Sequence, residues 1–222
     1  MNSSQIETRV ETIVRDVIDE MVIASPSPSN SSDRKIPIGI SARHLHITQE
    51  HLEHLFGQGK QLTNLKDLVE PGEFAANETV AIVGPNRRIF SKVRILGPVR
   101  SMTQVELSYT DGVYLGMDLP HRLSGDIKGS APVTIIGPQN VLRLPEGAIR
   151  AIRHIHMNPE DAEQLGVNNG DKVNVQTEGP ASVTFNNTII RVKEGLYLQM
   201  HVDTDEANAA GLDGANSYGI IL

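Results

Sequence analysis

The sequence predicts a mainly β protein with two small β-barrel domains capped by short α-helices, and three observations lead there. The first is an internal duplication, in which Arg43-His44-Leu45-His46 returns 110 residues later as Arg153-His154-Ile155-His156. The second is a series of short alternating strands separated by turn residues, and the third is the scarcity of helical periodicity. A chain of 222 residues suits two such domains, each large enough to bury a core.

The chain begins with a segment that differs from the rest. Apolar residues recur at helical spacing from Ile6 to Met21 with charged residues between them, which predicts an amphipathic helix over residues 1–24. Residues 25–35 are rich in serine and proline and predict a flexible linker. A helix tethered in this way docks on its own protein, pairs with its copies or binds a partner's groove.

From Ile36 onward short strands dominate the pattern. The clearest predicted strands are residues 36–40, 79–83, 89–95, 104–109, 133–136, 172–177, 188–192 and 196–202. Gly-Pro pairs interrupt these runs, as do Asn186-Asn187 and the Gly211 to Ser217 region.

Two short helices are predicted, one directly after each histidine pair. Over residues 158–166, Asn158 is a good N-cap, Pro159 suits the first turn and Gly166 ends the helix. Its counterpart in the first repeat spans residues 48–57. Each histidine pair therefore lies at a strand end, just before a helix.

Composition excludes several classes of function. The chain has 20 basic and 27 acidic residues, a net charge of −7 and no cysteine. No basic patch for nucleic acid, no membrane-spanning run and no secretory signal is visible, so we expect a soluble intracellular protein. Any bound metal must rest on nitrogen and oxygen ligands.

The repeated histidine pairs predict a metal site. Histidines at i and i+2 of a strand point to the same side, with the residue between them turned inward. One pair alone is weak evidence, but two copies are stronger. His201, late in an alternating strand, is a good third ligand, and Glu106 is its counterpart in the first repeat. Six ligands suit two open sites of three ligands each, although Glu106 alternatively points outward.

Arg100 is the candidate for binding an anion, because it lies six residues before Glu106. A guanidinium close to two metal cations is stable only if an anion lies between the guanidinium and the metals. Phosphate is the anion that best suits the two-pronged hydrogen bonding of arginine. The alternative is an ordinary solvated arginine. Ser124-Gly125-Asp126 and Gly129-Ser130 form a polar loop that offers further donors, which is a weak signal.

Together these motifs resemble one family, the PduL-type phosphotransacylases, which are the phosphate acyltransferases of bacterial microcompartments. The resemblance spans about Ile36 to Leu222. It rests on Ile38 to His46, Gly97 to Glu106, the Ser124 loop, Arg153 to Met157, and His201 followed by Asn208.

The resemblance implies an architecture and a location. One barrel would combine residues 36–42 with 152–222, the other would span 43–151, and two zinc ions would lie between them. A homodimer is implied, with the N-terminal helix directing the enzyme to the shell of a cytoplasmic microcompartment.

The resemblance also assigns residues. One zinc would take His44, His46 and His201, the other would take Glu106, His154 and His156, and Arg100 would hold phosphate. Contacts to coenzyme A would fall on Ser41, Lys66, Arg94, Leu96, His201 and Asn208.

The implied reaction is reversible transfer of a propionyl or acetyl group between coenzyme A and phosphate. Direct transfer is favoured because the chain has no cysteine to carry an acyl intermediate. Two other classes remain open from the residues alone. A dinuclear metallohydrolase would need a carboxylate bridging the metals, and a non-catalytic scaffold would need neither Arg100 nor open coordination positions. Three-ligand histidine sites favour zinc but also accept cobalt or manganese.

Overall fold

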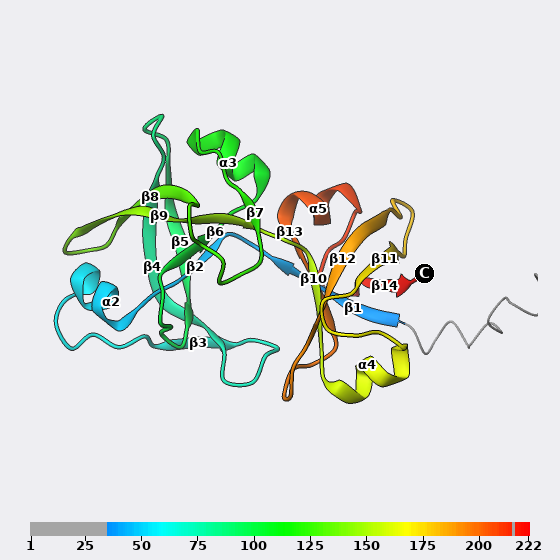
Figure 1. Cartoon of the computed structure of the whole chain (residues 1–222). Coiled ribbons are helices and arrows are strands. Elements are labelled where there is room, and N and C mark those ends of the chain that lie inside the picture. The colour runs from blue at the N-terminus through cyan, green and yellow to red at the C-terminus, as the bar shows by residue number, and fades with distance from the viewer. Residues whose placement is uncertain (1–34, 215) are drawn as a thin grey trace, which may run out of the picture. The chain divides into compact units, whose positions relative to one another are not determined.

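The computed structural model describes residues 35–214 and 216–222. The predicted helix over residues 1–24 and the linker up to residue 34 lie outside the described residues. Lys35, which closes the predicted linker, is instead the first residue of strand β1 (Lys35–Ser41). Within the described part the chain forms two closed six-stranded barrels with four short helices, which confirms the predicted fold class (Figure 1).

The first barrel, here called the Glu106 barrel, is closed in the order β4-β5-β2-β6-β9-β8, because β8 pairs with both β9 and β4. Its strands are β2 (His44–His46), β4 (Phe74–Val83), β5 (Ile89–Gly97), β6 (Gln104–Glu106), β8 (Ala131–Ile136) and β9 (Val141–Ala151). Two short strands extend the sheet outside this ring, β3 (Asn64–Asp67) on β4 and β7 (His121–Arg122) on β9.

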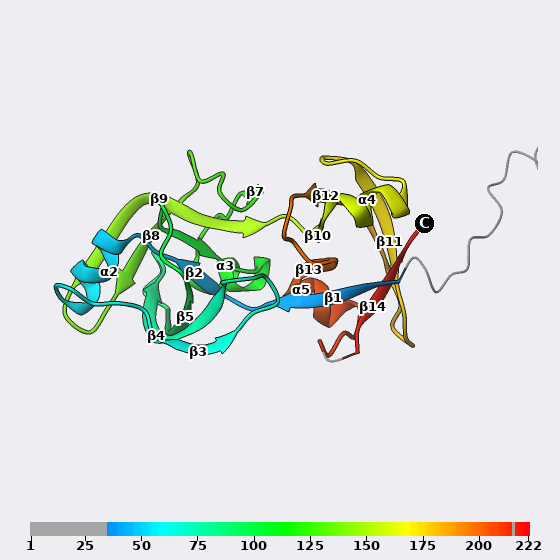
Figure 2. The same ribbon diagram turned by 90° about the horizontal axis from the view of Figure 1, so that it is seen from below.

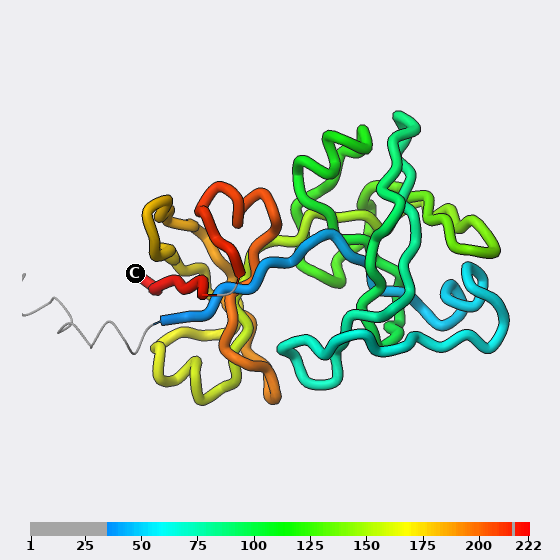
Figure 3. Tube along the Cα trace, turned by 180° about the vertical axis from the view of Figure 1, so that it is seen from behind, coloured from blue at the N-terminus to red at the C-terminus, as the bar shows by residue number. Residues whose placement is uncertain are grey.

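The second barrel, here called the His201 barrel, is closed in the order β1-β13-β10-β12-β11-β14. Besides β1 its strands are β10 (His154–Met157), β11 (Lys172–Thr177), β12 (Thr184–Val192), β13 (Gln199–Asp203) and β14 (Tyr218–Ile221). The ring closes where β14 at the C-terminus pairs antiparallel with β1, so the two ends of the described chain lie side by side (Figure 3).

Both barrels use one pairing scheme. In each, the histidine strand is parallel to one neighbour, β5 or β12, and antiparallel to the other, β6 or β13. Each repeat gives its first strand to the other barrel: β1 leads into β2 but closes the His201 barrel, whereas β9 leads into β10 but closes the Glu106 barrel (Figure 2). Each histidine pair therefore follows directly on a strand that crosses between the barrels.

Each barrel has its own hydrophobic core, one containing Leu45, Ile82 and Ile95, the other Ile155 and Met200. Leu45 and Ile155 are the residues between the paired histidines, and both are fully buried. Since side chains alternate along a strand, burying the middle residue in the core turns both histidines of each pair to the opposite side.

The two helices expected after the histidine pairs are present as α2 (Gln49–Phe56) and α4 (Pro159–Leu165). Thr48 and Asn158 cap their first turns through their side chains. Gly166 ends α4 in the left-handed conformation, with φ of 67°.

Two further helices were not predicted, α3 (Tyr109–Leu115) and α5 (Thr204–Ala209), and both begin with a capping box. The strand expected over residues 104–109 was therefore too long, because it ends at Glu106 and Ser108 caps α3. The strand expected from residue 196 begins only at Gln199.

The long strand β9 was also missed. Pro145 and Gly147 lie within it, and Gly147 has a φ of 145°, so the local sequence argues against a continuous strand. Among the described residues, no helix has the length and apolar character needed to cross a membrane.

Candidate functional site

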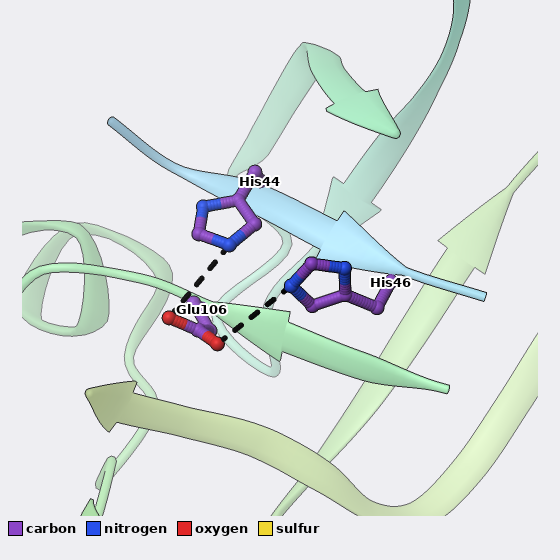
Figure 4. A group of neighbouring side chains, drawn as sticks. All are labelled: His44, His46 and Glu106. Atoms are coloured by element: carbon purple, nitrogen blue, oxygen red, sulfur yellow. Dashed lines mark ion pairs between the residues drawn. The ribbon is translucent and has the colours of Figure 1, made fainter. Parts of the chain in front are cut away.

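The first histidine pair lies against Glu106. His44 and Glu106 are register partners on the antiparallel strands β2 and β6. His44 Nε2 lies 3.7 Å from Glu106 Oε2, and His46 Nε2 lies 4.0 Å from Glu106 Oε1 (Figure 4). All three side chains are buried. This group offers two imidazole nitrogens and a carboxylate within the reach of one ion.

The second pair lies against His201 in the same way. His154 and His201 are register partners on β10 and β13. The ring of His201 lies 5.1 Å from that of His154 and 4.8 Å from that of His156, measured between centroids. His201 Nε2 is buried and finds no hydrogen-bond partner in the described part of the chain, which is an unstable arrangement unless a further ligand completes it.

The backbone sets the orientation of the first histidine in each pair. His44 Nδ1 donates to the carbonyl of Ala42 at 2.9 Å, and His154 Nδ1 donates to that of Ile152 at 2.8 Å. Donation through Nδ1 leaves the Nε2 lone pair free to bind a metal. The duplication therefore reproduces the ring orientation as well as the strand.

Burial keeps most of these imidazoles neutral. It lowers the pKa of His46 to about 3, and those of His154 and His156 to about 4. Burial also holds the pKa of His201 well below its usual value. At near-neutral pH these histidines are in the unprotonated form that binds metals.

Glu106 is held as a carboxylate. Burial, the largest single influence, raises its pKa, but His44, His46, Ser124 and His154 together outweigh it, so the net pKa lies below the ordinary value. Its Oε1 accepts hydrogen bonds from Gln104 Nε2 at 2.6 Å and from Ser124 Oγ at 2.8 Å. The Ser124 loop thus touches the site through Glu106.

Four of the six predicted ligands, His44, Glu106, His154 and His201, line a single cavity together with Ser41. Donor atoms that lie within 4.8 Å of one another group His44 and His46 with Glu106, and His156 and His201 with Glu70. The resemblance divides the ligands differently, pairing His201 with His44 and His46. That crossed division stays a prediction.

Arg100 lies near both groups. Its positive charge contributes to lowering the pKa of His46 and of His156, one histidine from each barrel. Its Nη2 forms an ion pair of 2.6 Å with Glu73 Oε1. Its side chain is 36% exposed, so the guanidinium is accessible to a small anion.

Two charged residues beside the second group were not predicted. Arg191 is the register partner of His156 on β12, and its charge contributes to lowering the pKa of His154, His156 and His201. Glu70 accepts a hydrogen bond from His156 Nδ1 at 2.7 Å. The alternation of side chains along β12 (Thr184–Val192) could have predicted the side of the strand on which Arg191 lies, whereas no sequence pattern indicates Glu70.

The residues that the resemblance assigns to coenzyme A are spread over several elements. Ser41 and His201 line the cavity. Lys66, Ala75 and Leu96 lie in one row across β3, β4 and β5. The other two assigned residues are Arg94, whose guanidinium donates to the carbonyl of Ala76, and Asn208, which is exposed on α5.

The arginine of each repeated motif has a structural role. Arg43 Nη2 pairs with Asp111 in the capping box of α3 at 2.7 Å, and the guanidinium lies over Phe90. Arg153 pairs with Glu206 in the capping box of α5 at 2.6 Å, and it lies over Phe185. These contacts tie each histidine strand to the helix that follows the facing strand.

The donor set fits zinc. Neutral imidazoles and one carboxylate are ligands that zinc accepts, three-ligand groups leave a coordination position open, and the orphaned His201 Nε2 calls for a partner.

Comparison with known proteins gives a consistent result. Residues 37–213 match the model of a family described as phosphate propanoyltransferase. A phosphate propanoyltransferase of Lachnoclostridium phytofermentans is 49% identical over 92% of this chain and 94% of its own length. Those of Thermotoga maritima and Salmonella typhimurium are 51% and 44% identical, over 84% and 96% of this chain and 89% and 96% of their own lengths.

Proposed function

This chain belongs to the phosphate propanoyltransferase family, a family of acyltransferases, and from that premise we propose that it exchanges a short acyl group between coenzyme A and inorganic phosphate at a dinuclear zinc site. Propionyl is the acyl group that the names of the relatives suggest. Acetyl remains an alternative that the assay below distinguishes.

The observation that supports the proposal is that Glu106 and His201 each face a histidine pair, at a cavity lined by His44, Glu106, His154 and His201. Arg100 lies close enough to both pairs for its charge to lower the pKa of one histidine in each. We assign one zinc to His44, His46 and Glu106, and the other to His154, His156 and His201, because strand register places each single ligand opposite the first histidine of its own barrel.

Bound zinc would supply Lewis acidity toward phosphate and the thioester carbonyl. Arg100 would bind the phosphate, exchanging its ion pair with Glu73 for contacts to the phosphate oxygens. A phosphate oxygen then attacks the thioester carbonyl carbon, a carbon–oxygen bond forms, the carbon–sulfur bond breaks and coenzyme A leaves as the thiolate. The chain has no cysteine to carry a thioester-linked intermediate, which favours direct transfer of the acyl group to phosphate.

Coenzyme A would approach along Ser41, Lys66, Arg94, Leu96, His201 and Asn208. We further propose that the enzyme is a homodimer and that residues 1–34 direct it to the shell of a bacterial microcompartment. These assignments rest on the family resemblance, with Ser41 and His201 supported by their position in the cavity.

The decisive experiment measures loss of propionyl-CoA and acetyl-CoA with and without phosphate, on protein whose zinc content is known. We expect thioester loss only with phosphate, together with formation of an acyl phosphate that hydroxylamine traps. Thioester loss without phosphate would indicate a metallohydrolase. A metal-loaded protein that cleaves no thioester under either condition would contradict the enzymatic proposal.

A further inference from the structure

The segment between α2 and β4, residues 57–73, has no equivalent of its length in the second repeat. The corresponding connection between α4 and β11 spans only residues 166–171. The longer segment contains β3 and then a tight turn. It is the part of the Glu106 barrel that departs most from the duplication.

The turn at the end of this segment is closed by backbone hydrogen bonds. The amide of Glu73 donates to the carbonyl of Glu70 at 3.1 Å, with Pro71 and Gly72 between them. Gly72 has a φ of 78°, the value that the third residue of a type II turn requires, and proline is favoured at the second. The amide of Leu68 also donates to the carbonyl of Glu73 at 3.0 Å.

Each end of the turn holds a residue of the site. Glu73 pairs with Arg100, as described above. Glu70 Oε1 accepts from His156 Nδ1 at 2.7 Å, and Glu70 is buried with only 8% of its surface exposed. Glu70 comes from the Glu106 barrel whereas His156 belongs to the His201 barrel, so this contact crosses between the two.

On the basis of the proposed function, we propose that Glu70 is a positioning residue for the second metal site, holding His156 as the Nδ1–H tautomer so that Nε2 faces the ion. Backbone carbonyls do the same for His44 and His154. For His156 the acceptor of the Nδ1 proton is the carboxylate of Glu70 in the turn, whereas for His44 and His154 it is a backbone carbonyl. The strands that pair with β10 all belong to its own barrel, so Glu70 is a contact from the other barrel.

The test measures zinc affinity and ring protonation separately from catalysis. Metal-free wild type, Glu70→Ala and Glu70→Gln are titrated with zinc against a chromophoric chelator. The control is Glu163→Gln, which changes an exposed carboxylate on α4 of the His201 barrel. We expect Glu70→Ala to weaken one of the two sites about 10–100-fold, the usual effect of losing such a partner, and to leave the other site unchanged.

Glu70→Gln should recover part of that affinity, since an amide oxygen still accepts the Nδ1 proton. Proton–nitrogen correlation spectra of the metal-free protein should show the proton of His156 on Nδ1 in wild type and a mixture of the two tautomers in Glu70→Ala. If Glu70→Ala does not fold, the zinc affinity of the isosteric Glu70→Gln is compared with that of the Glu163→Gln control, and equal affinities would overturn the proposal.

Two results would overturn the proposal. One is an affinity in Glu70→Ala equal to that of the Glu163→Gln control. The other is complete loss of one ion at saturating zinc, which would make Glu70 a direct ligand. Failure of the proposed function is distinguishable, because wild type would then bind two zinc ions without cleaving a thioester in the presence of phosphate.

Discussion

The Glu106 barrel and the His201 barrel share a pairing scheme, an arginine-to-cap ion pair and a backbone-held first histidine, yet they present different side chains to the site. Where one has Glu106 opposite its first histidine, the other has His201. Arg191 on β12 is the register partner of His156. The equivalent position in the Glu106 barrel, on β5 next to His46, is occupied by Leu96, which follows the paired residue Ile95.

This comparison separates what duplication preserved from what changed. Strand register and the orientation of the first ring are common to both barrels because the backbone determines them. The charges around the two histidine pairs differ because single side chains at equivalent positions differ. The group around Glu106 contains a carboxylate, and the group around His201 is made of neutral imidazoles flanked by Arg191 and Glu70. We therefore expect two zinc sites of unequal affinity.

The largest effect should come from removing a ligand of either half. His44→Ala and His154→Ala should each reduce transfer by about 10³-fold or more and each lose about one zinc per chain, because each breaks a three-ligand set. Metal analysis and the phosphate-dependent assay measure both. The exposed His54→Ala should retain both ions and full activity.

Double variants decide how the ligands are divided. If each barrel holds its own ion, His44→Ala with Glu106→Ala should lose one zinc, whereas His44→Ala with His201→Ala should lose both. The crossed division that the resemblance implies gives the reverse pattern.

Arg100 should matter to both halves without binding metal. Arg100→Ala should keep two zinc ions and lose about 10²-fold in rate, by analogy with removal of one donor to a developing charge. Arg100→Lys should recover the rate only partly, since an ammonium cannot make the planar two-pronged contact. Saturation curves for phosphate and coenzyme A measure this, with the exposed Arg143→Ala as control. Unchanged phosphate saturation in Arg100→Ala would remove it from the anion site.

Acid should destabilise the metal-free protein through its buried histidines. The pKa values of His46, His154 and His156 lie at about 3, 4 and 4, below the ordinary 6.5 of an unfolded chain. Between pH 6.5 and 4 the unfolded state binds more protons, so the free energy of unfolding falls as pH falls, by about 1.4 kcal/mol per unit for each histidine.

Urea unfolding of chelator-treated protein at several pH values measures this slope. His154→Asn should reduce it, whereas the exposed His54→Asn should leave it as in wild type. A free energy of unfolding that is constant from pH 7 to 4.5 would contradict the prediction.

A smaller effect should follow from removing the motif arginines. Arg43→Ala leaves the buried Asp111 without its cation, and Arg153→Ala does the same to Glu206. Because Arg43 is about two-fifths exposed, solvent screens its pair, and we expect about 1–2 kcal/mol of destabilisation. Equal losses in urea unfolding would confirm that the two contacts are equivalent, and the exposed pair Arg122–Asp126 offers Arg122→Ala as a control.

The smallest effect should come from the segment that precedes Lys35 in the chain. Removing residues 1–34 should leave the rate in solution within about twofold, because the closed barrels begin at Lys35 and contain all the predicted ligands. The truncated enzyme should no longer co-purify with microcompartments. Co-purification at the full-length level would contradict a targeting role for this segment.

Local rules in the sequence determined much of this protein. Alternation along a strand predicted that Leu45 and Ile155 are buried beneath paired histidines, and capping residues predicted α2 and α4. The counterpart relation of Glu106 and His201 followed from the residues after each of them, an apolar residue and then a polar pair, and strand register agrees with it. These features depend on residues close together in the chain, so a single sequence is enough to find them.

Only the tertiary structure decided how distant segments meet. Pairing of β1 with β13 and of β9 with β6 carries no local signal, and neither does the grouping of each single ligand with the histidines of its own barrel. Glu70 looks like an ordinary loop carboxylate until the turn at residues 70–73 brings it within 2.7 Å of His156, a residue 86 positions away. A hydrogen bond depends on separation in space, and the folded arrangement of the two barrels sets that separation.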